Sequence, residues 1–158
     1  MQVELIPATR QQEPVLAKLL ELYADDFRKF QDIPQGSDGR FYYAPLPLYW
    51  TQPDRHPFLL MSGGTIVGFV FVGRRNGCWD IVEFFVLPAH RRRRLGTQAA
   101  HAAWHRFPGK WTVRVLRSNR PAGVFWRHAI TAFTRQPAAS VPTLENGELW
   151  DHFSFESA

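Results

Sequence analysis

The residues with the clearest chemical potential lie in one segment, IVEFFVLPAHRRRRLGTQAA, at positions 81–100. An apolar strand ends before Pro88, and a helix begins near Leu95 and Gly96, directly after four successive arginines. The first backbone N–H groups of a helix have no partner within it, and the macrodipole adds partial positive charge there. Such a junction favours phosphate, and arginines add charge and paired donors. A basic helix start that faces solvent fits this segment alone equally well.

Two carboxylates on the strand before this loop are candidate general bases, Glu83 and Asp80. A substrate ammonium of pKa about 10 must lose a proton before its nitrogen can attack a carbonyl. Because the two residues are three positions apart, we expect their side chains on opposite faces of the sheet, with only one addressing a cleft. We favour Glu83, since desolvation in the apolar run IVEFFVL would raise its pKa. The alternative for Glu83 is a structural ion pair with an arginine.

Charge is segregated along the chain. The net charge is +5, but no acidic residue lies between Glu83 and Glu145, a stretch that holds 11 of the 19 lysines and arginines. Such a segment attracts a polyanion, either a nucleotide cofactor or nucleic acid. No helix–turn–helix, RRM or zinc-finger pattern accompanies the basic residues, so nucleic acid is the less favoured partner.

Size and composition indicate a single domain over residues 1–158. The longest apolar stretches, 58–61 and 65–72, are far shorter than a bilayer span, and no signal peptide is visible, so we expect a cytoplasmic protein without a membrane partner. The single cysteine, Cys78, excludes an internal disulfide. No histidine pair has metal-ligand spacing with a carboxylate, so no metal is expected; His56 and His90 are weak candidates for proton transfer.

Hydrophobic periodicity predicts an α/β fold in which most of the sheet is antiparallel. Turn residues separate strands 58–62, 65–73 and 78–87 into a meander. A helix that Pro108 and Gly109 stop then leads to strand 111–116, which this crossover places parallel to strand 78–87. The remaining expected elements are a strand at 2–6, a helix at 12–23, a helix capped by Asn119, and a closing hairpin of 141–144 and 149–155.

These residues resemble the cofactor motif of the GNAT superfamily of N-acetyltransferases, R/Q-x-x-G-x-G/A, with Arg91 at the first position and Gly96 at the last. The stretch WTVRVLRSNRPAGVFW resembles the family's next strand and its N-x-x-A-x-x-F/L-Y helix start, with Asn119, Ala122 and Phe125 in register. DRHPFLL, EFFVLP and the basic loop resemble a bacterial subgroup of predicted acetyltransferases. The order of elements agrees over nearly the whole chain.

The resemblance implies a GNAT-like mixed sheet with flanking helices and a β-α-β crossover that binds acetyl-CoA, without a metal. Acetyl-CoA would lie in a splay between strands 78–87 and 111–116. The implied cofactor-binding residues are the pantetheine-facing backbone of Phe85, Val86 and Leu87, the pyrophosphate loop of Arg91, Arg92, Arg93, Arg94, Leu95, Gly96 and Thr97, and Asn119 and Trp126 near the thioester. The implied activity is acetyl transfer to a primary amine of a small molecule or peptide.

Two residues depart from the family pattern. Arg94 stands where the first glycine is expected, and a positive φ there would cost about 1 kcal/mol or more. Trp126 stands where many relatives have a tyrosine that protonates the leaving thiolate, and an indole N–H is no acid at neutral pH. A catalytically inactive CoA-binding sensor is therefore an alternative function.

The acidic and aromatic segment 23–50 is a candidate substrate lip or a hydrophobic flap. A homodimer is compatible with the sequence.

Overall fold

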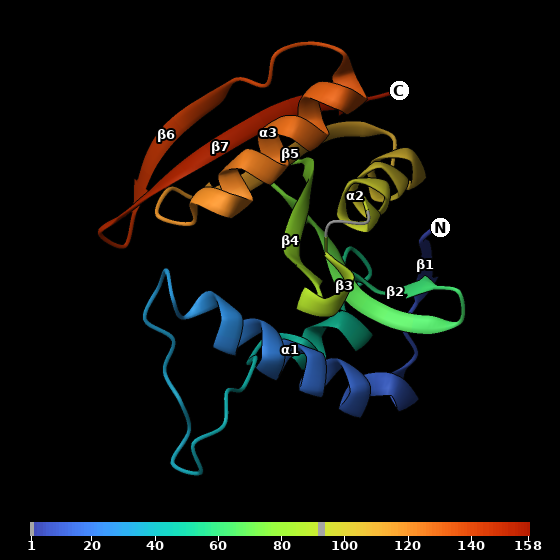
Figure 1. Cartoon of the computed structure of the whole chain (residues 1–158), viewed down its shortest axis with the longest axis vertical. Helices are drawn as coiled ribbons and strands as arrows, with labels where there is room; N and C mark the ends of the chain where they lie inside the picture. Colours follow the sequence, from blue (N-terminus) through green and yellow to red (C-terminus); the bar gives the residue numbers. More distant parts are fainter. Residues whose placement is uncertain (1, 92–93) are drawn as a thin grey trace.

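The computed structural model describes residues 2–91 and 94–158, which form one sheet with helices on both of its faces (Figure 1). The strands are β1 (Glu4–Pro7), β2 (His56–Ser62), β3 (Thr65–Arg75), β4 (Cys78–Val86), β5 (Gly109–Leu116), β6 (Ser140–Glu145) and β7 (Glu148–Ser157). The α-helices are α1 (Glu13–Phe27), α2 (Leu95–Arg106) and α3 (Arg120–Thr134), and the 3-10 helices are η1 (Arg10–Gln12), η2 (Leu46–Trp50) and η3 (Pro88–His90).

The strands are ordered β1-β2-β3-β4-β5-β7-β6 across the sheet. Neighbouring strands are antiparallel except β4 and β5, which are parallel and connected through α2. The predicted meander, crossover and closing hairpin are therefore confirmed. None of the helices in the described part of the chain is long and apolar enough to cross a bilayer.

Helix α1 extends one turn further than the expected 12–23, to Phe27. Pro14 occupies its first turn. The additional turn carries two aspartates, each with a basic partner three positions further along the chain. Asp25 pairs with Arg28 at 3.1 Å and Asp26 pairs with Lys29 at 3.2 Å. Side-chain pairs at this spacing stabilise a helix modestly, which accounts for an extension that apolar periodicity alone does not show.

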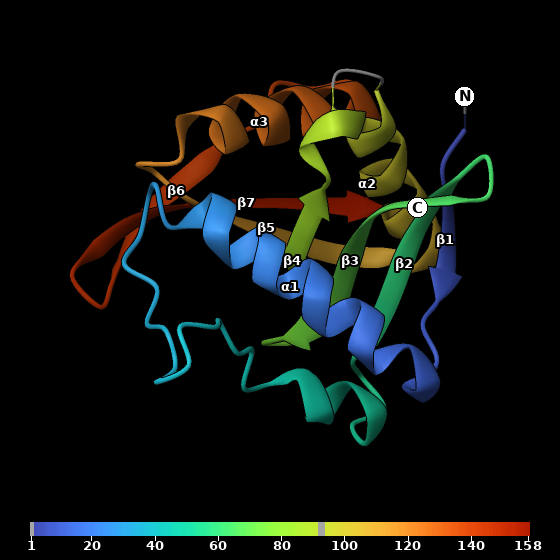
Figure 2. The same cartoon turned by 60° about the horizontal axis from the view of Figure 1, so that its bottom comes forward.

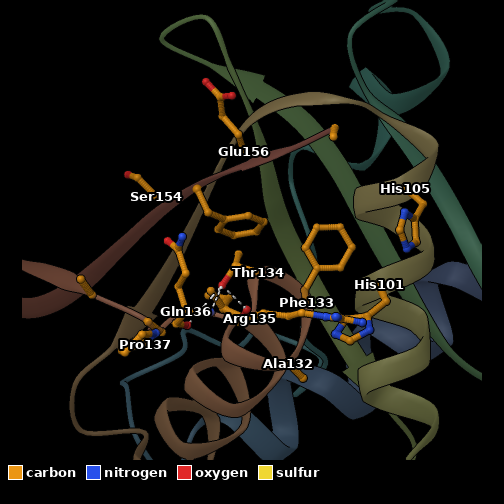
Figure 3. A pocket seen from close by; sticks show the side chains of 15 residues that line it. His101, His105, Ala132, Phe133, Thr134, Arg135, Gln136, Pro137, Ser154 and Glu156 are labelled. Carbon is orange, nitrogen blue, oxygen red and sulfur yellow. Dashed lines mark hydrogen bonds between the residues drawn. The ribbon is translucent and has the colours of Figure 1, made fainter.

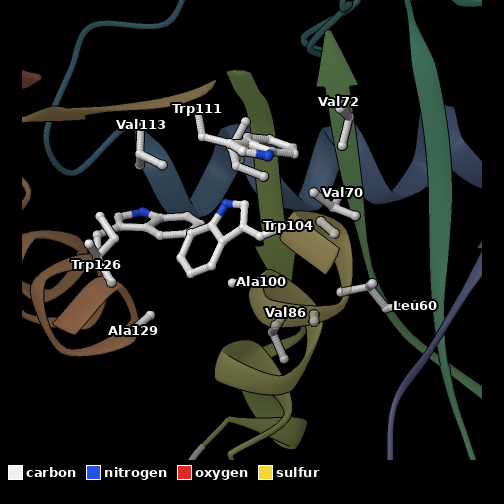
Figure 4. Packing of buried hydrophobic residues seen from close by; sticks show 14 of the residues in the cluster. Leu60, Val70, Val72, Val86, Ala100, Trp104, Trp111, Val113, Trp126 and Ala129 are labelled. Atoms are coloured by element: carbon white, nitrogen blue, oxygen red, sulfur yellow. The ribbon is translucent and has the colours of Figure 1, made fainter. Parts of the chain in front are cut away.

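The sheet separates two hydrophobic clusters. Helices α2 and α3 cover one face, where Trp104, Trp111 and Trp126 form the centre of the larger cluster (Figure 4). Helix α1 crosses the other face of β2, β3 and β4, as Figure 2 shows, and η2 packs beside it. Leu46 and Tyr49 of η2 are buried there, so the aromatic segment acts at least in part as the expected hydrophobic flap.

A close backbone approach fixes the register of β3 and β4. A Cβ atom on Gly68 would lie 2.0 Å from the carbonyl oxygen of Phe85. Gly68→Ala should therefore destabilise the protein by about 1–3 kcal/mol, because strand β4 must move to make room. Gly123 in α3 is the matched control, since its Cβ would meet nothing within 4 Å. Gly123→Ala should instead stabilise by about 0.5–1 kcal/mol through helix propensity. Equal effects of the two substitutions in urea unfolding would contradict this account.

Candidate active site

Strands β4 and β5 form a gap at the centre of the sheet. They pair only through Trp79 with Trp111 and Asp80 with Thr112, after which β5 continues along β7. The Leu87 N–H donates to the Val67 carbonyl at 2.8 Å, so Leu87 is directed toward β3. Because ladder bonding alternates along an antiparallel strand, the amide groups of Phe84 and Val86 face the gap. Of the expected residues 85–87, Val86 thus has its N–H directed at the gap and Leu87 has its N–H bonded to β3. The binding of pantetheine at this edge stays a prediction.

Arg91 anchors the loop after β4 by two polar contacts. Its Nε donates to the Val86 carbonyl at 2.9 Å, and its Nη2 lies 2.9 Å from Asp26 Oδ2 on α1. Its guanidinium also lies over the Phe85 ring at 5.6 Å. Arg91 therefore ties the loop to α1, and its expected contact with phosphate stays a prediction. Arg92 and Arg93, which were also expected to bind phosphate, lie outside the described residues.

Arg94 adopts a left-handed conformation with φ 59° and ψ 12° directly before α2. This is the conformation for which glycine is favoured, and it explains the glycine of the family motif. The Arg94 side chain does not cap α2, so the first amides of the helix, from Leu95 to Thr97, remain available to a ligand. The Leu95 side chain itself is buried in the core.

Gly96 has a packing role that the sequence did not indicate. A Cβ atom there would lie 2.9 Å from the Phe125 ring of α3. Gly96 therefore allows the first turn of α2 to contact α3, and its φ is not among the positive ones. This contact accounts for a glycine at position 96 without a bound ligand.

The two residues expected near the thioester have structural partners. Asn119 Oδ1 accepts a hydrogen bond from Ala122 N at 3.2 Å, which makes Asn119 the N-cap of α3. Trp126 is 7% exposed and packs edge-to-face on Phe84 with ring centroids 5.0 Å apart. Trp126 thus belongs to the hydrophobic cluster on the α2 and α3 side of the sheet, and its expected position near the thioester stays a prediction.

Both candidate carboxylates lie on the α1 side of the sheet, contrary to the expectation of opposite faces. Phe71 pairs with Glu83 and Val72 pairs with Ile81, so Val82 is an extra residue in β4. This β-bulge shifts the alternation of side chains by one position. The expectation of opposite faces was wrong because side chains alternate strictly between the two faces only along an unbroken strand.

Asp80 is buried, with 2% of its surface exposed, at the point where the gap begins. Arg114 Nη2 lies 2.9 Å from Asp80 Oδ2, and Thr112 Oγ1 donates to Asp80 Oδ1 at 3.1 Å. Burial raises the pKa of Asp80, and the charge and hydrogen bond of Arg114 oppose that rise. The ion pair with Arg114 holds Asp80 between β4 and β5 and, unlike the neutral tyrosine donors of Glu83, places a positive charge on the carboxylate, so Asp80 has a structural role at the β4–β5 junction.

Glu83 accepts hydrogen bonds from two tyrosines. Tyr23 Oη lies 2.9 Å from Glu83 Oε1, and Tyr43 Oη lies 3.1 Å from Oε2. Burial raises the pKa of Glu83, and the two hydrogen bonds partly offset that rise. An arginine salt bridge, the alternative considered for Glu83, is not among the ion pairs of residues 2–91 and 94–158. The environment is that of a carboxyl group suited to accept a proton.

Aspartates of segment 23–50, the candidate substrate lip, are largely engaged by other groups. Asp25 and Asp26 form ion pairs, and Asp38 accepts a hydrogen bond from Tyr42.

Burial lowers the pKa of His56, which packs on the Phe107 ring 4.8 Å away. Among the described residues, no group of three or more histidine, cysteine or acidic side chains could hold a metal ion.

Two open depressions flank the sheet. The larger, of about 760 Å³, lies between the C-terminal halves of α2 and α3 and the end of β7, and His101, His105 and Arg135 line it (Figure 3). The smaller, of about 400 Å³, lies where Phe30 approaches the C-terminal end of β5 and the start of β7. Neither includes Glu83, whose surroundings are filled by tyrosine rings.

Comparison with known proteins gives the family. A family model described as the acetyltransferase (GNAT) family matches residues 16–129. The chain belongs to this family. No curated protein matched the chain. The sequence-based identification of a GNAT domain is thereby confirmed.

Solved GNAT structures share the fold at low sequence identity. An acetyltransferase from Thermus thermophilus is similar with a TM-score of 0.73 and 18% identity, over 99% of this chain and 97% of that one. The spermidine N-acetyltransferase from Vibrio cholerae, solved with CoA and spermine, gives 0.70 and 13%, over 99% and 96%. The GNAT domain of S. lividans PAT gives 0.65 and 17%, over 97% and 89%. The mixed, mostly antiparallel sheet is therefore that of GNAT acetyltransferases.

Several site residues of this GNAT domain were not foreseen from the sequence. Tyr23 and Tyr43 lie 60 and 40 positions from Glu83, a separation that local patterns do not bridge. Arg114 could have been noticed as the one charged residue in the apolar run WTVRVL. Its position on an otherwise buried strand indicates an acidic partner, which Asp80 provides.

Proposed function

We propose that this GNAT domain transfers an acetyl group from acetyl-CoA to a primary amine of a small molecule or peptide. The observation that carries the proposal is the β4–β5 gap, which opens beside the uncapped start of α2 and has Glu83 on the strand that borders it. The V. cholerae structural neighbour, described with CoA and spermine, supports an amine as the acceptor class.

The residues around the gap fit acetyl-CoA. The backbone groups of Phe84 and the N–H of Val86 are directed at the gap, so the pantetheine arm would pair with them as an additional strand, while the Val86 carbonyl is bonded by Arg91. The amides from Leu95 to Thr97 at the start of α2 would hold the pyrophosphate. The surrounding segment 84–144 contains no acidic residue, which favours an anionic ligand.

The chemistry requires one proton acceptor and one stabilised oxyanion. Glu83 would take a proton from the substrate ammonium, and the neutral nitrogen would then attack the thioester carbonyl. A backbone N–H at the gap would stabilise the negative charge that develops on the carbonyl oxygen. As the C–S bond of the tetrahedral intermediate breaks, CoA leaves as the thiolate, which its pKa of about 8.5 allows without protonation by Trp126. The nitrogen loses its remaining extra proton to the departing thiolate or to water, so the products are the N-acetylated amine and CoA.

Calorimetric titration with CoA, followed by turnover of acetyl-CoA with a panel of amines, tests this function. We expect stoichiometric CoA binding with modest salt dependence and release of free thiol when a suitable amine is present. Binding that weakens steeply with salt would instead indicate a basic surface of the kind that binds nucleic acid. Absence of heat at millimolar CoA would defeat the proposal.

Arg94→Gly should change protein stability and CoA affinity in opposite directions. The substitution should stabilise the protein by about 1 kcal/mol, because glycine accepts a positive φ. It should also weaken CoA binding several-fold, because a cation beside the pyrophosphate site is lost. Arg135→Gly is the matched control, since Arg135 has the same φ of 59° at the end of α3. That variant should gain similar stability in denaturant unfolding and keep its CoA affinity; equal affinity losses would contradict the assignment.

A further inference from the structure

Two tyrosine hydroxyls hold the carboxylate of Glu83 from different parts of the chain. Tyr23 on α1 donates to Oε1 at 2.9 Å, and Tyr43 in the segment between α1 and β2 donates to Oε2 at 3.1 Å. One donor on each oxygen fixes the plane of the carboxylate. It also leaves the second lone pair of each oxygen for a further donor, such as a substrate ammonium.

Tyr43 is itself held by rings of the same cluster. Its ring lies 5.9 Å from Phe71, and the Tyr49 ring lies 4.4 Å from Phe71. Phe71 is fully buried on β3 and is the cross-strand partner of Glu83. The Tyr43 hydroxyl is therefore positioned by packing against the residue directly opposite Glu83.

We propose that Tyr43 is a positioning residue for the acetyl transfer, acting by orienting the Glu83 carboxylate and favouring its ionised form. The proposal rests on the proposed role of Glu83 as the general base. The segment between α1 and β2 would then have a role in the reaction, because its packing against the sheet brings the Tyr43 hydroxyl to Glu83.

Charged and titratable groups face Glu83 from each neighbouring element. Hydrogen bonds from Tyr23 on α1 and from Tyr43, together with the charge of Arg114 on β5, lower the pKa of Glu83, whereas burial and the charge of Asp80 on β4 raise it. Burial and the charge of Glu83 also raise the pKa of Tyr49 on η2. Burial and the Glu83 charge raise the pKa of Tyr43, so Tyr43 stays protonated and remains a donor.

The sign of the effect follows from the form that the hydrogen bond stabilises. Tyr43 donates to ionised Glu83, so removing its hydroxyl must raise the pKa of Glu83 further. A general base acts only when deprotonated, so the acid limb of kcat/KM must move to higher pH. Tyr43→Phe should shift this limb upward by about one pH unit, given the usual strength of a charged hydrogen bond.

The pKa of Glu83 should also be measured without turnover, by carbon-13 NMR titration of glutamate carboxyls with CoA bound, assigned with Glu83→Gln. Tyr42→Phe is the matched control, because Tyr42 is 66% exposed and bonds to Asp38; it should leave the Glu83 pKa at the parent value. Tyr23→Phe repeats the test from the other donor if Tyr43→Phe does not fold.

Three outcomes are distinguishable. An upward shift of both the Glu83 pKa and the acid limb supports the proposal. A Glu83 pKa that does not move in Tyr43→Phe overturns it, whatever the activity. A pKa that moves while the acid limb stays in place also overturns it, and shows that the assignment of Glu83 as the base has failed while CoA binding is unaffected.

Discussion

Glu83→Gln should lower the turnover number by a factor of about 10²–10⁴, the usual contribution of a general base. The amide keeps the size of the side chain and its ability to accept a hydrogen bond from one tyrosine, but it cannot take a proton from the acceptor ammonium. CoA affinity should stay within about twofold, because the side chain points to the α1 side of the sheet, away from the start of α2. Steady-state kinetics and calorimetry on the same preparation measure both quantities.

Glu156→Gln is the control for this substitution. It removes the same charge from an exposed position on β7, so neither turnover nor CoA affinity should change. If Glu83→Gln matches the parent enzyme in turnover across the pH range, Glu83 takes no part in proton transfer.

Asp80→Ala should cost about 2–4 kcal/mol of stability. Arg114 would lose its carboxylate partner at the only place where β4 and β5 pair, and a buried cation left without a partner is costly. The expected loss is smaller than for a fully buried ion pair, because the Arg114 side chain is 25% exposed and solvent screens part of its charge. Urea unfolding, with the slope compared between variants, measures the loss.

Asp151→Ala provides the comparison. Asp151 on β7 also forms an ion pair with an arginine, Arg117 directly after β5, at 2.6 Å, but that arginine side chain is 50% exposed. Its removal should cost much less stability, because solvent screens an exposed pair. A loss at Asp80 no greater than the loss at Asp151 would show that the β4–β5 junction does not depend on the buried pair.

Local patterns were sufficient to predict most of the fold. The turn pairs at 63–64 and 76–77 marked real turns, the Asn119 cap begins α3, and the crossover through α2 makes β4 and β5 parallel. These features depend on residues adjacent in sequence, where backbone conformation and side-chain period act directly.

The arrangement around Glu83 could not be predicted in the same way. The bulge at Val82 depends on how β3 and β4 align, and no local signal marks it, so the side-chain alternation derived from the sequence failed at that point. The two tyrosines reach Glu83 only because α1 and η2 fold against the same face of the sheet. The contact between Arg91 and Asp26 was not predicted either, because it depends on where α1 ends.

Release of free thiol from acetyl-CoA in the presence of a panel of primary amines, followed against pH for the parent protein and Glu83→Gln, tests the central claim most directly. We expect amine-dependent release in the parent protein, an acid limb above the usual pKa range of a glutamate, and loss of most of that release in the variant. Tight CoA binding without thiol release for any amine would contradict the claim and identify the protein as a CoA-binding sensor.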